Sequence, residues 1–241
     1  MNCIIKPAGD CAVTIELGNS ISPEVNHAIR ALQKALAQCG QTGILEVQPA
    51  YCSMTLHYDP AVLPYRTLCG IVDSAAKNAS VIELPAGRVI ELPVLYGGEE
   101  GPDLDEVAKY NHISSQEVIR LHTEGCYLVY MLGFVPGFPY LGGMNEKIAT
   151  PRLETPRTII PSGSVGIAGK QTGVYPLSTP GGWRLIGRTP VRLYAPEREE
   201  PILLRAGDTV RFRSVSREEY QKIRMLDARG EYCCEVEKET L

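Results

Sequence analysis

Length, composition and charge place the chain among ordinary globular proteins. It has 241 residues, of which 44% are hydrophobic and 22% charged, so we expect a packed core in one large domain or two smaller ones. The net charge of −4 gives no electrostatic reason to expect nucleic acid as a partner. No apolar run approaches the roughly 18–20 residues that span a bilayer, and the N-terminal sequence lacks a signal-peptide pattern, so a cytoplasmic protein without a membrane anchor is expected.

Residues 1–85 predict an α+β domain. Strand-like runs at residues 3–6 and 12–16 precede Ser22 and Pro23, a capping residue followed by proline at the first helical position. Apolar residues then recur at helical spacing until Gly40. Two alternating runs and a second helix follow, at residues 44–47, 53–58 and 65–78. We interpret this order as a ferredoxin-like βαββαβ sandwich.

Residues 86–241 predict a second domain of mainly β structure. A strand over 88–95 precedes two helices, which begin at Asp103 and at Ser114 or Ser115. From residue 126 onward, short apolar runs alternate with Gly/Pro turns, a pattern that favours a closed or partly closed β-barrel with the two helices attached. The candidate strands are CYLVYML, RTIIP, SVGIAG, RLIGRTPVRLY, PILL and DTVRFRSV, and a terminal helix begins after Ser216.

Residues 133–190 concentrate glycine and proline, yet they also contain large aromatic side chains. A segment of this kind without aromatics would be a flexible linker. Because glycine and proline specify unusual backbone angles, the aromatics indicate stiff loops and short strands around a core. The aromatic residues are Phe134, Phe138, Tyr140, Tyr175 and Trp183. The same segment carries four arginines, which makes it the first place to look for a site: Arg152, Arg157, Arg184 and Arg188.

The four arginines are candidates for binding a carboxylate or a phosphate. Arg152 and Arg157 each directly follow a proline, and Arg184 and Arg188 follow GGW and IG. A guanidinium group on a stiff segment loses little entropy when it binds an anion in a bidentate manner. The alternative is that these side chains form ion pairs with Glu154 and other acidic residues at the barrel rim.

His122 is the histidine best placed for proton transfer. It lies where a helix gives way to a strand, and the ordinary pKa of histidine is close to neutrality. The alternative is a structural histidine that caps the helix or bonds a backbone carbonyl. Gln171 and Tyr175, beside the glycine-rich residues 163–169, are candidates for hydrogen bonds to a small substrate.

Several common sites are excluded by spacing. Residues 163–169, GSVGIAG, lack the Gly-Lys-Ser/Thr sequence and the following helix of a phosphate loop. No GxSxG nucleophile elbow is present. The eight cysteines form no CxxC pair and the four histidines are dispersed, so we expect reduced thiols and no metal site.

Four long motifs resemble the KipI family, whose members are also called the B subunit of 5-oxoprolinase and, under an older label, allophanate hydrolase subunit 1. They are YGGEEGPDLDEVA, VIRLHTEGCYLVYMLGFVPGFPYLGG, IIPSGSVGIAGKQTGVYPLSTPGGWRLIGRTP and RAGDTVRF, and the resemblance covers nearly the whole chain. It implies a cyclophilin-like β-barrel in residues 86–241. It also implies one component of a bacterial ATP-dependent 5-oxoprolinase, which converts 5-oxo-L-proline to L-glutamate together with the A and C subunits.

The resemblance also implies roles for the candidate residues. Opening a lactam with ATP needs cations that hold the substrate carboxylate and the transferring phosphate. His122, Arg152 and Arg157 are then the catalytic candidates, and Gln171, Tyr175, Arg184 and Arg188 the substrate-binding ones. ATP is expected to be bound by the assembled complex, and the chain alone is expected to be inactive. Two alternatives stay open: an inhibitor that binds a sporulation histidine kinase, and a scaffold whose loops form only a partner interface.

Overall fold

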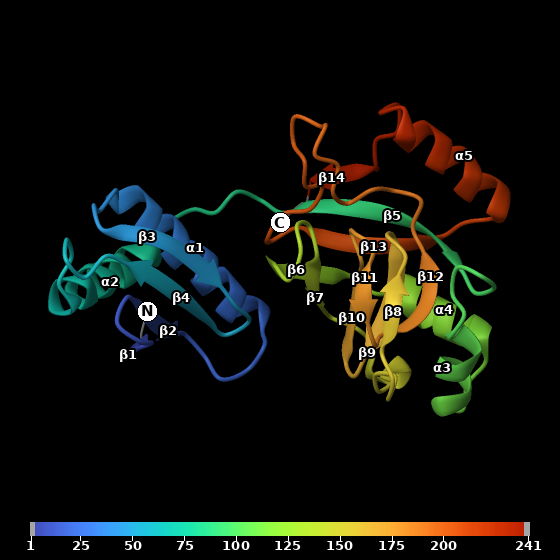
Figure 1. The fold of residues 1–241 in the computed structure, drawn as a ribbon, viewed down its shortest axis with the longest axis horizontal. Coiled ribbons are helices and arrows are strands. Elements are labelled where there is room, and N and C mark those ends of the chain that lie inside the picture. Colours follow the sequence, from blue (N-terminus) through green and yellow to red (C-terminus); the bar gives the residue numbers. More distant parts are fainter. Residues whose placement is uncertain (1–2, 239–241) are drawn as a thin grey trace. The chain divides into compact units, whose positions relative to one another are not determined.

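A computed structural model describes residues 3–238 of the chain, which divides into two compact units, Met1–Ala86 and Gly87–Leu241 (Figure 1). The sequence places the boundary between residues 85 and 86. Each unit has its own hydrophobic core.

The first unit is a four-stranded antiparallel sheet packed against two helices. The strands are ordered β1-β2-β4-β3. Alternate residues of β4, Met54, Leu56 and Tyr58, are buried in the same core as Leu32 and Leu68 from the two helices. The elements are β1 (Ile4–Pro7), β2 (Ala12–Glu16), α1 (Pro23–Cys39), β3 (Ile44–Pro49), β4 (Ser53–Tyr58) and α2 (Tyr65–Ala79).

Local sequence explains the limits of α1. The Ser22 hydroxyl accepts a hydrogen bond from the Val25 amide at 3.3 Å, and Pro23 occupies the first turn, where its missing N–H costs nothing. The helix ends at Gly40, whose φ of 56° lies in the left-handed region. Both ends agree with the sequence prediction.

The predicted βαββαβ order of this unit requires a correction. The observed order is ββαββα, with two strands before α1 and none after α2. The two N-terminal runs form a hairpin, in which β1 becomes the edge strand beside β2. After α2, Ile82 and Leu84 pack against the core without forming a strand. Pro85, which cannot donate a backbone hydrogen bond to a ladder, lies in this irregular segment.

The second unit is built around a sheet that curves into a nearly closed barrel (Figure 1). Its strands run in the order β10-β9-β12-β5-β13-β6-β7, and β10 at one end lies beside β7 at the other. The barrel predicted from the alternation of apolar runs and turns is therefore present. The strands are β5 (Arg88–Tyr96), β6 (Tyr127–Leu132), β7 (Pro139–Gly142), β8 (Arg157–Ile160), β9 (Ser164–Ala168), β10 (Gln171–Val174), β11 (Thr179–Gly181), β12 (Arg184–Arg188), β13 (Thr209–Ser214) and β14 (Val236–Lys238).

The longest strand of the barrel, β5, has three neighbours. It pairs in parallel with β13 over six residues, and antiparallel with β12 near Tyr96 and with β14 near Ile90. Its buried residues, with those of β9 and β12, fill the barrel core. Strands β8 and β11 form a separate two-stranded sheet. Residues 201–204, PILL, do not form the expected strand, and only a single bridge joins Ile202 to Tyr194.

The helices of the second unit pack around the barrel. Helix α3 (Leu104–Tyr110) lies against β12, α4 (Ser115–Thr123) against β13 and α5 (Arg217–Ala228) against β5, and a 3-10 turn, η1, spans Glu146–Ile148. Ser114 and Ser216 cap α4 and α5 by accepting from the amides of Glu117 and Glu219. Within residues 3–238, no helix has the length and apolar character needed to cross a bilayer.

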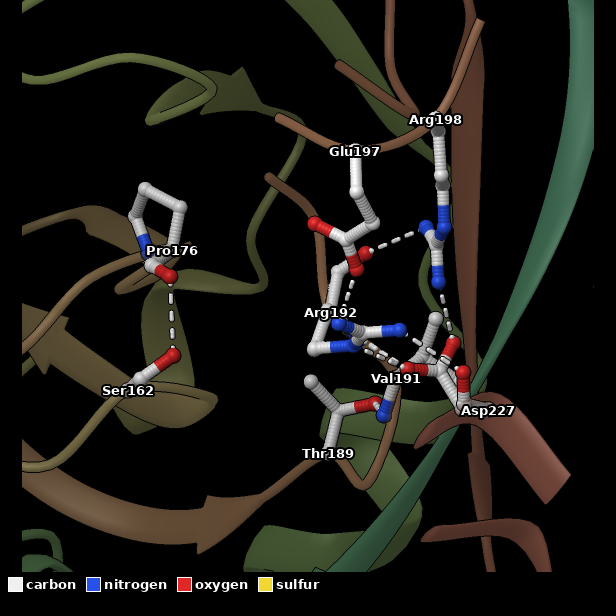
Figure 2. A network of polar contacts seen from close by, with 8 residues as sticks. All are labelled: Ser162, Pro176, Thr189, Val191, Arg192, Glu197, Arg198 and Asp227. Atoms are coloured by element: carbon white, nitrogen blue, oxygen red, sulfur yellow. Dashed lines mark hydrogen bonds and ion pairs between the residues drawn. The ribbon is translucent and has the colours of Figure 1, made fainter. Parts of the chain in front are cut away.

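A polar network fixes α5 to the loop that follows β12 (Figure 2). The Asp227 carboxylate, with only 2% of its side chain exposed, accepts from Arg192 Nε and from an amino group of Arg198, each at 2.7 Å. The Asp227 carbonyl also accepts from Arg192, and Arg198 donates to the Arg192 carbonyl. A buried carboxylate needs such partners, because burying an unpaired charge is costly.

Candidate functional site

An aromatic cavity of about 190 Å³ opens among the loops and strands of the Gly/Pro-rich segment. It is called the aromatic pocket below. Its residues come from the loop before β7, from β7, from the loop after η1, from β10 and its end, and from β11 and the turn before β12. They are Phe134, Phe138, Tyr140, Arg152, Gln171, Tyr175, Pro180, Gly181, Gly182 and Trp183. Three residues selected from the sequence, Arg152, Gln171 and Tyr175, are thereby brought together.

The aromatic rings of the pocket hold one another in place. Phe138 is at the centre and makes edge-to-face contacts with Tyr140, Tyr175 and Trp183, with ring centroids 5.4, 5.5 and 5.8 Å apart. Tyr175 and Trp183 contact each other in the same way at 6.0 Å. Edge-to-face pairs are stabilising beyond the area they bury. The pocket walls are therefore built before any ligand arrives.

Glycines keep the space between these rings open. A Cβ atom on Gly181 would lie 2.7 Å from both the Tyr175 hydroxyl and Ile160 Cδ1. A Cβ atom on Gly173 would lie 2.9 Å from the Trp183 ring. Cβ atoms essentially never lie this close to other heavy atoms, so any residue larger than glycine at either position would displace a wall of the pocket.

Arg152 supplies the positive charge of the pocket. Its guanidinium carbon lies over the Trp183 ring, 6.0 Å from the centroid, at the limit for a cation–π contact. None of the lining residues is acidic. Burial raises the pKa of the neighbouring Tyr175 to about 12, with Arg152 opposing the shift. The phenol is therefore neutral at physiological pH and can donate a hydrogen bond.

Phe134 lines the pocket and is 67% exposed, with a φ of 64°. The left-handed region is unfavourable for a bulky side chain. Backbone hydrogen bonds from Gly133 to Phe138, from Val135 to Gly133 and from Phe138 to Val135 hold the loop in this shape. An exposed aromatic side chain in a strained conformation beside a cavity is typical of a binding site.

The other three candidate arginines are engaged in ion pairs. Arg157 pairs with Asp103 at 2.7 Å, Arg184 pairs with Glu106, and Arg188 pairs with Glu100 at 3.3 Å. Arg184 also donates to the Pro151 carbonyl and Arg188 to the Ser162 carbonyl. The structure thus matches the alternative of pairing with acidic residues, although Glu154 is none of these partners. Within residues 3–238, Arg152 alone of the four has no carboxylate partner.

His122 lies in the last turn of α4, just before β6, as the sequence predicted, but its side chain is buried in the barrel core. Its exposed fraction is 0%, and its ring stacks on Phe212 with centroids 4.5 Å apart. Nδ1 bonds the Tyr96 hydroxyl at 2.8 Å and Nε2 bonds Thr172 Oγ1 at 2.9 Å. Thr172 donates its own proton to the Gly166 carbonyl, so it accepts from His122, which is then the neutral tautomer protonated at Nε2.

Burial lowers the pKa of His122 to about 3. The ring is neutral at physiological pH, both nitrogens have partners, and it does not line the aromatic pocket. A role in moving protons at the pocket is therefore not supported by its position. The position fits the alternative of a structural histidine, although its ring bonds the hydroxyls of Tyr96 and Thr172 and no backbone carbonyl.

The described residues contain no cluster of metal ligands, and the glycine-rich segment does not form a phosphate loop. Within residues 3–238, no group of three His, Cys, Asp or Glu side chains is arranged to hold a metal. Within the glycine-rich residues 163–169, Ser164–Ala168 form β9, a buried strand, in place of a loop that leads into a helix. All eight cysteines are free thiols.

The sequence pattern indicated a core for the aromatics of this segment, but it did not indicate that they enclose a cavity. The sequence GFVPGF could have indicated that Phe134 lies in a turn, because glycine and proline flank it closely and both residues favour turns. The arrangement as a whole can hold a small, flat molecule between rings and pair its anionic group with Arg152.

Comparison with known proteins assigns the chain to a family. A family model described as "Carboxyltransferase domain, subdomain C and D" matches residues 3–204. A Bacillus subtilis (strain 168) protein, named as the B subunit of 5-oxoprolinase, is 46% identical over 226 residues, which cover 90% of this chain and 94% of that protein. A Haemophilus influenzae protein of the same name is 56% identical over 208 residues, covering 86% of this chain and 96% of that protein.

A solved structure shares the fold of most of the chain. The crystal structure of the protein TTHA0988 matches with a TM-score of 0.75 and 39% sequence identity, covering 88% of this chain. This chain spans 40% of the length of that longer protein. With these identities over most of its length, the chain belongs to the family of 5-oxoprolinase B subunits, within the carboxyltransferase subdomain C and D group.

Proposed function

We propose that this protein is the B subunit of an ATP-dependent 5-oxoprolinase, which converts 5-oxo-L-proline to L-glutamate. The observation that supports this most strongly is the near full-length identity with two proteins that are named as B subunits of 5-oxoprolinase. Those names favour an enzyme subunit over an inhibitor of a histidine kinase. The aromatic pocket adds a site of suitable size and charge for a small carboxylate.

The partners in this proposal are the A and C subunits of the same enzyme. In TTHA0988 the matching region is joined to further sequence that makes up the larger part of the chain. Because the same fold forms one part of the longer TTHA0988 chain, we propose that this protein forms one component of a complex. The second unit is accordingly proposed to be a cyclophilin-like barrel that follows a separate α+β domain. This fold by itself does not assign an activity.

The division of chemistry follows from what this chain contains. A lactam resists hydrolysis because its amide is stabilised by resonance, and phosphorylation of the carbonyl oxygen by ATP would activate it. The glycine-rich segment forms the buried strand β9, and the described residues hold no group of three metal ligands for that step. We therefore assign ATP binding to the assembled complex, and to this chain the holding of 5-oxoproline.

Reconstitution from the separately purified subunits tests the proposed function. The three-subunit mixture should release L-glutamate and inorganic phosphate in a 5-oxoproline-dependent manner, and omission of this chain should abolish both. Glutamate formation that is equally fast without this chain would refute the proposal. If this chain instead lowers autophosphorylation of a sporulation histidine kinase and has no effect on 5-oxoproline, the regulatory alternative would replace it.

A further inference from the structure

We infer that the aromatic pocket alone gives this chain a preformed binding site for 5-oxoproline, with Arg152 pairing with the ligand carboxylate and the aromatic rings enclosing the planar lactam. The choice of 5-oxoproline among small carboxylate-bearing rings rests on the proposed function. The existence of an anion-selective site for a small flat ring rests on the pocket itself.

The dimensions of the pocket limit the ligand to a small molecule. Its volume of about 190 Å³ lies below the roughly 300–1,000 Å³ of pockets that hold drug-sized ligands. A nucleotide or an extended peptide therefore does not fit inside. A five-membered ring with one carboxylate does, and its flat amide offers a face to the rings of Phe138, Tyr175 and Trp183.

The charge of the pocket selects an anion. The guanidinium of Arg152 has no carboxylate partner within residues 3–238, whereas those of Arg157, Arg184 and Arg188 each have one. Its contact with the Trp183 ring places it along one wall without neutralising it. A ligand carboxylate can therefore take the position that Asp103, Glu106 and Glu100 take for the other three arginines.

Neutral groups of the pocket can recognise the lactam. Tyr175 keeps its phenolic proton at physiological pH, so it can donate to the lactam carbonyl oxygen. Gln171 also lines the pocket, and its side-chain amide carries both a hydrogen-bond donor and a hydrogen-bond acceptor. Phe134, held with a φ of 64° and 67% exposed, is positioned to cover a bound ring.

The full chain provides its own reporter of binding. Trp183 is the single tryptophan of the sequence, and it lines the pocket. Titration with 5-oxoproline should change the tryptophan fluorescence in a saturable manner, and isothermal calorimetry should give the same affinity. The comparison ligands are 2-pyrrolidone, which lacks the carboxylate, L-proline, which lacks the lactam carbonyl, and L-glutamate, which lacks the ring.

Arg152→Gln should weaken 5-oxoproline binding about tenfold to a hundredfold, which is the loss expected for one charge-assisted pair. The weaker binding of 2-pyrrolidone should stay unchanged, because that ligand has no carboxylate that could pair with Arg152. The matched control is Arg120→Gln, which removes an arginine that forms ion pairs with Glu117 and Glu124 on the surface of α4. This variant should bind both ligands as the wild type does. Tyr175→Phe tests the proposed donor independently, and circular dichroism checks that each variant is folded.

Two results would overturn the inference. One is the absence of saturable 5-oxoproline binding to the folded chain, and the other is an affinity that Arg152→Gln does not change. Either result together with an active reconstituted enzyme would reject this pocket while keeping the proposed function. Binding as inferred in a chain that has no effect in the reconstitution would keep the pocket and reject the proposed function.

Discussion

The guanidinium of Arg157 donates to the carboxylate of Asp103 at 2.7 Å, and the same carboxylate accepts from the Leu185 amide at 2.6 Å. Asp103 is the residue before α3, Arg157 begins β8 and Leu185 lies in β12. One nearly buried acid therefore ties three elements of the second unit together. Arg157 thus holds elements of the second unit together, whereas Arg152, in the loop before β8, contacts the Trp183 ring and lines the aromatic pocket.

Replacing Arg157 should therefore cost stability. In Arg157→Gln, Asp103 stays buried with its charge opposed only by the Leu185 amide, so the free energy of unfolding should fall by about 2–3 kcal/mol. Urea denaturation followed by circular dichroism measures the change. Arg184→Gln is the control, because its partner Glu106 is exposed and the loss should stay below about 1 kcal/mol. An Arg157 variant as stable as the wild type would contradict this account.

Acid should destabilise the second unit partly through His122. Its pKa is lowered to about 3 in the folded protein and is about 6.5 when unfolded, so the unfolded state binds more protons between those values. The contribution of the neutral His122 ring to the free energy of unfolding is therefore complete above pH 6.5. It is lost as the pH falls toward 3, at up to about 1.4 kcal/mol per pH unit. The difference in unfolding free energy between wild type and His122→Gln should shrink accordingly.

The carboxylates titrate in the same pH range, but their effect is common to both proteins and cancels in that difference. His27→Gln, at an exposed position of α1, is the control for loss of an imidazole. His122→Gln should also retain 5-oxoproline binding, because His122 lies outside the pocket lining. Loss of binding in a folded His122→Gln protein would restore the catalytic interpretation.

Two adjacent glycines should respond differently to alanine. Gly181→Ala places a Cβ 2.7 Å from the Tyr175 hydroxyl, so it should narrow the aromatic pocket and reduce 5-oxoproline affinity about tenfold or more. Gly182→Ala meets its nearest atom, the Leu153 carbonyl oxygen, at 3.6 Å and should be tolerated. Calorimetric titration of both variants checks the pair, and equal affinities would count against the assigned pocket.

Asp227 should control the attachment of α5. Removing its charge in Asp227→Ala leaves Arg192 and Arg198 without their buried partner, so the free energy of unfolding should fall by about 3 kcal/mol (Figure 2). Hydrogen exchange of the α5 amides should also become faster. Glu197→Gln removes only an exposed partner of Arg192 and should change stability by under about 1 kcal/mol. Unchanged exchange in Asp227→Ala would show that apolar packing holds the helix.

The sequence predicted the helices and much of the sheet because their signals are local. Ser22, Ser114 and Ser216 each cap the helix that follows them, and each accepts from an amide three residues ahead. The strands β7, β10 and β11 were missed, because they lie in Gly/Pro-rich stretches and are defined by their partners across the barrel. The elements of the first unit were predicted individually, but their interpretation as βαββαβ was wrong, because only strand pairing shows that β1 is an edge strand beside β2.

The sequence by itself determined the family, the caps, the two units and the segment in which the aromatic pocket lies, because each depends on residue types at short spacing. Tertiary structure alone decided what the candidate residues contact. Arg157, Arg184 and Arg188 pair with acids 54, 78 and 88 residues away, and His122 is held in the core between Tyr96 and Thr172. Charge and burial are settled by neighbours distant in the chain, and those neighbours leave Arg152 to face the aromatic pocket.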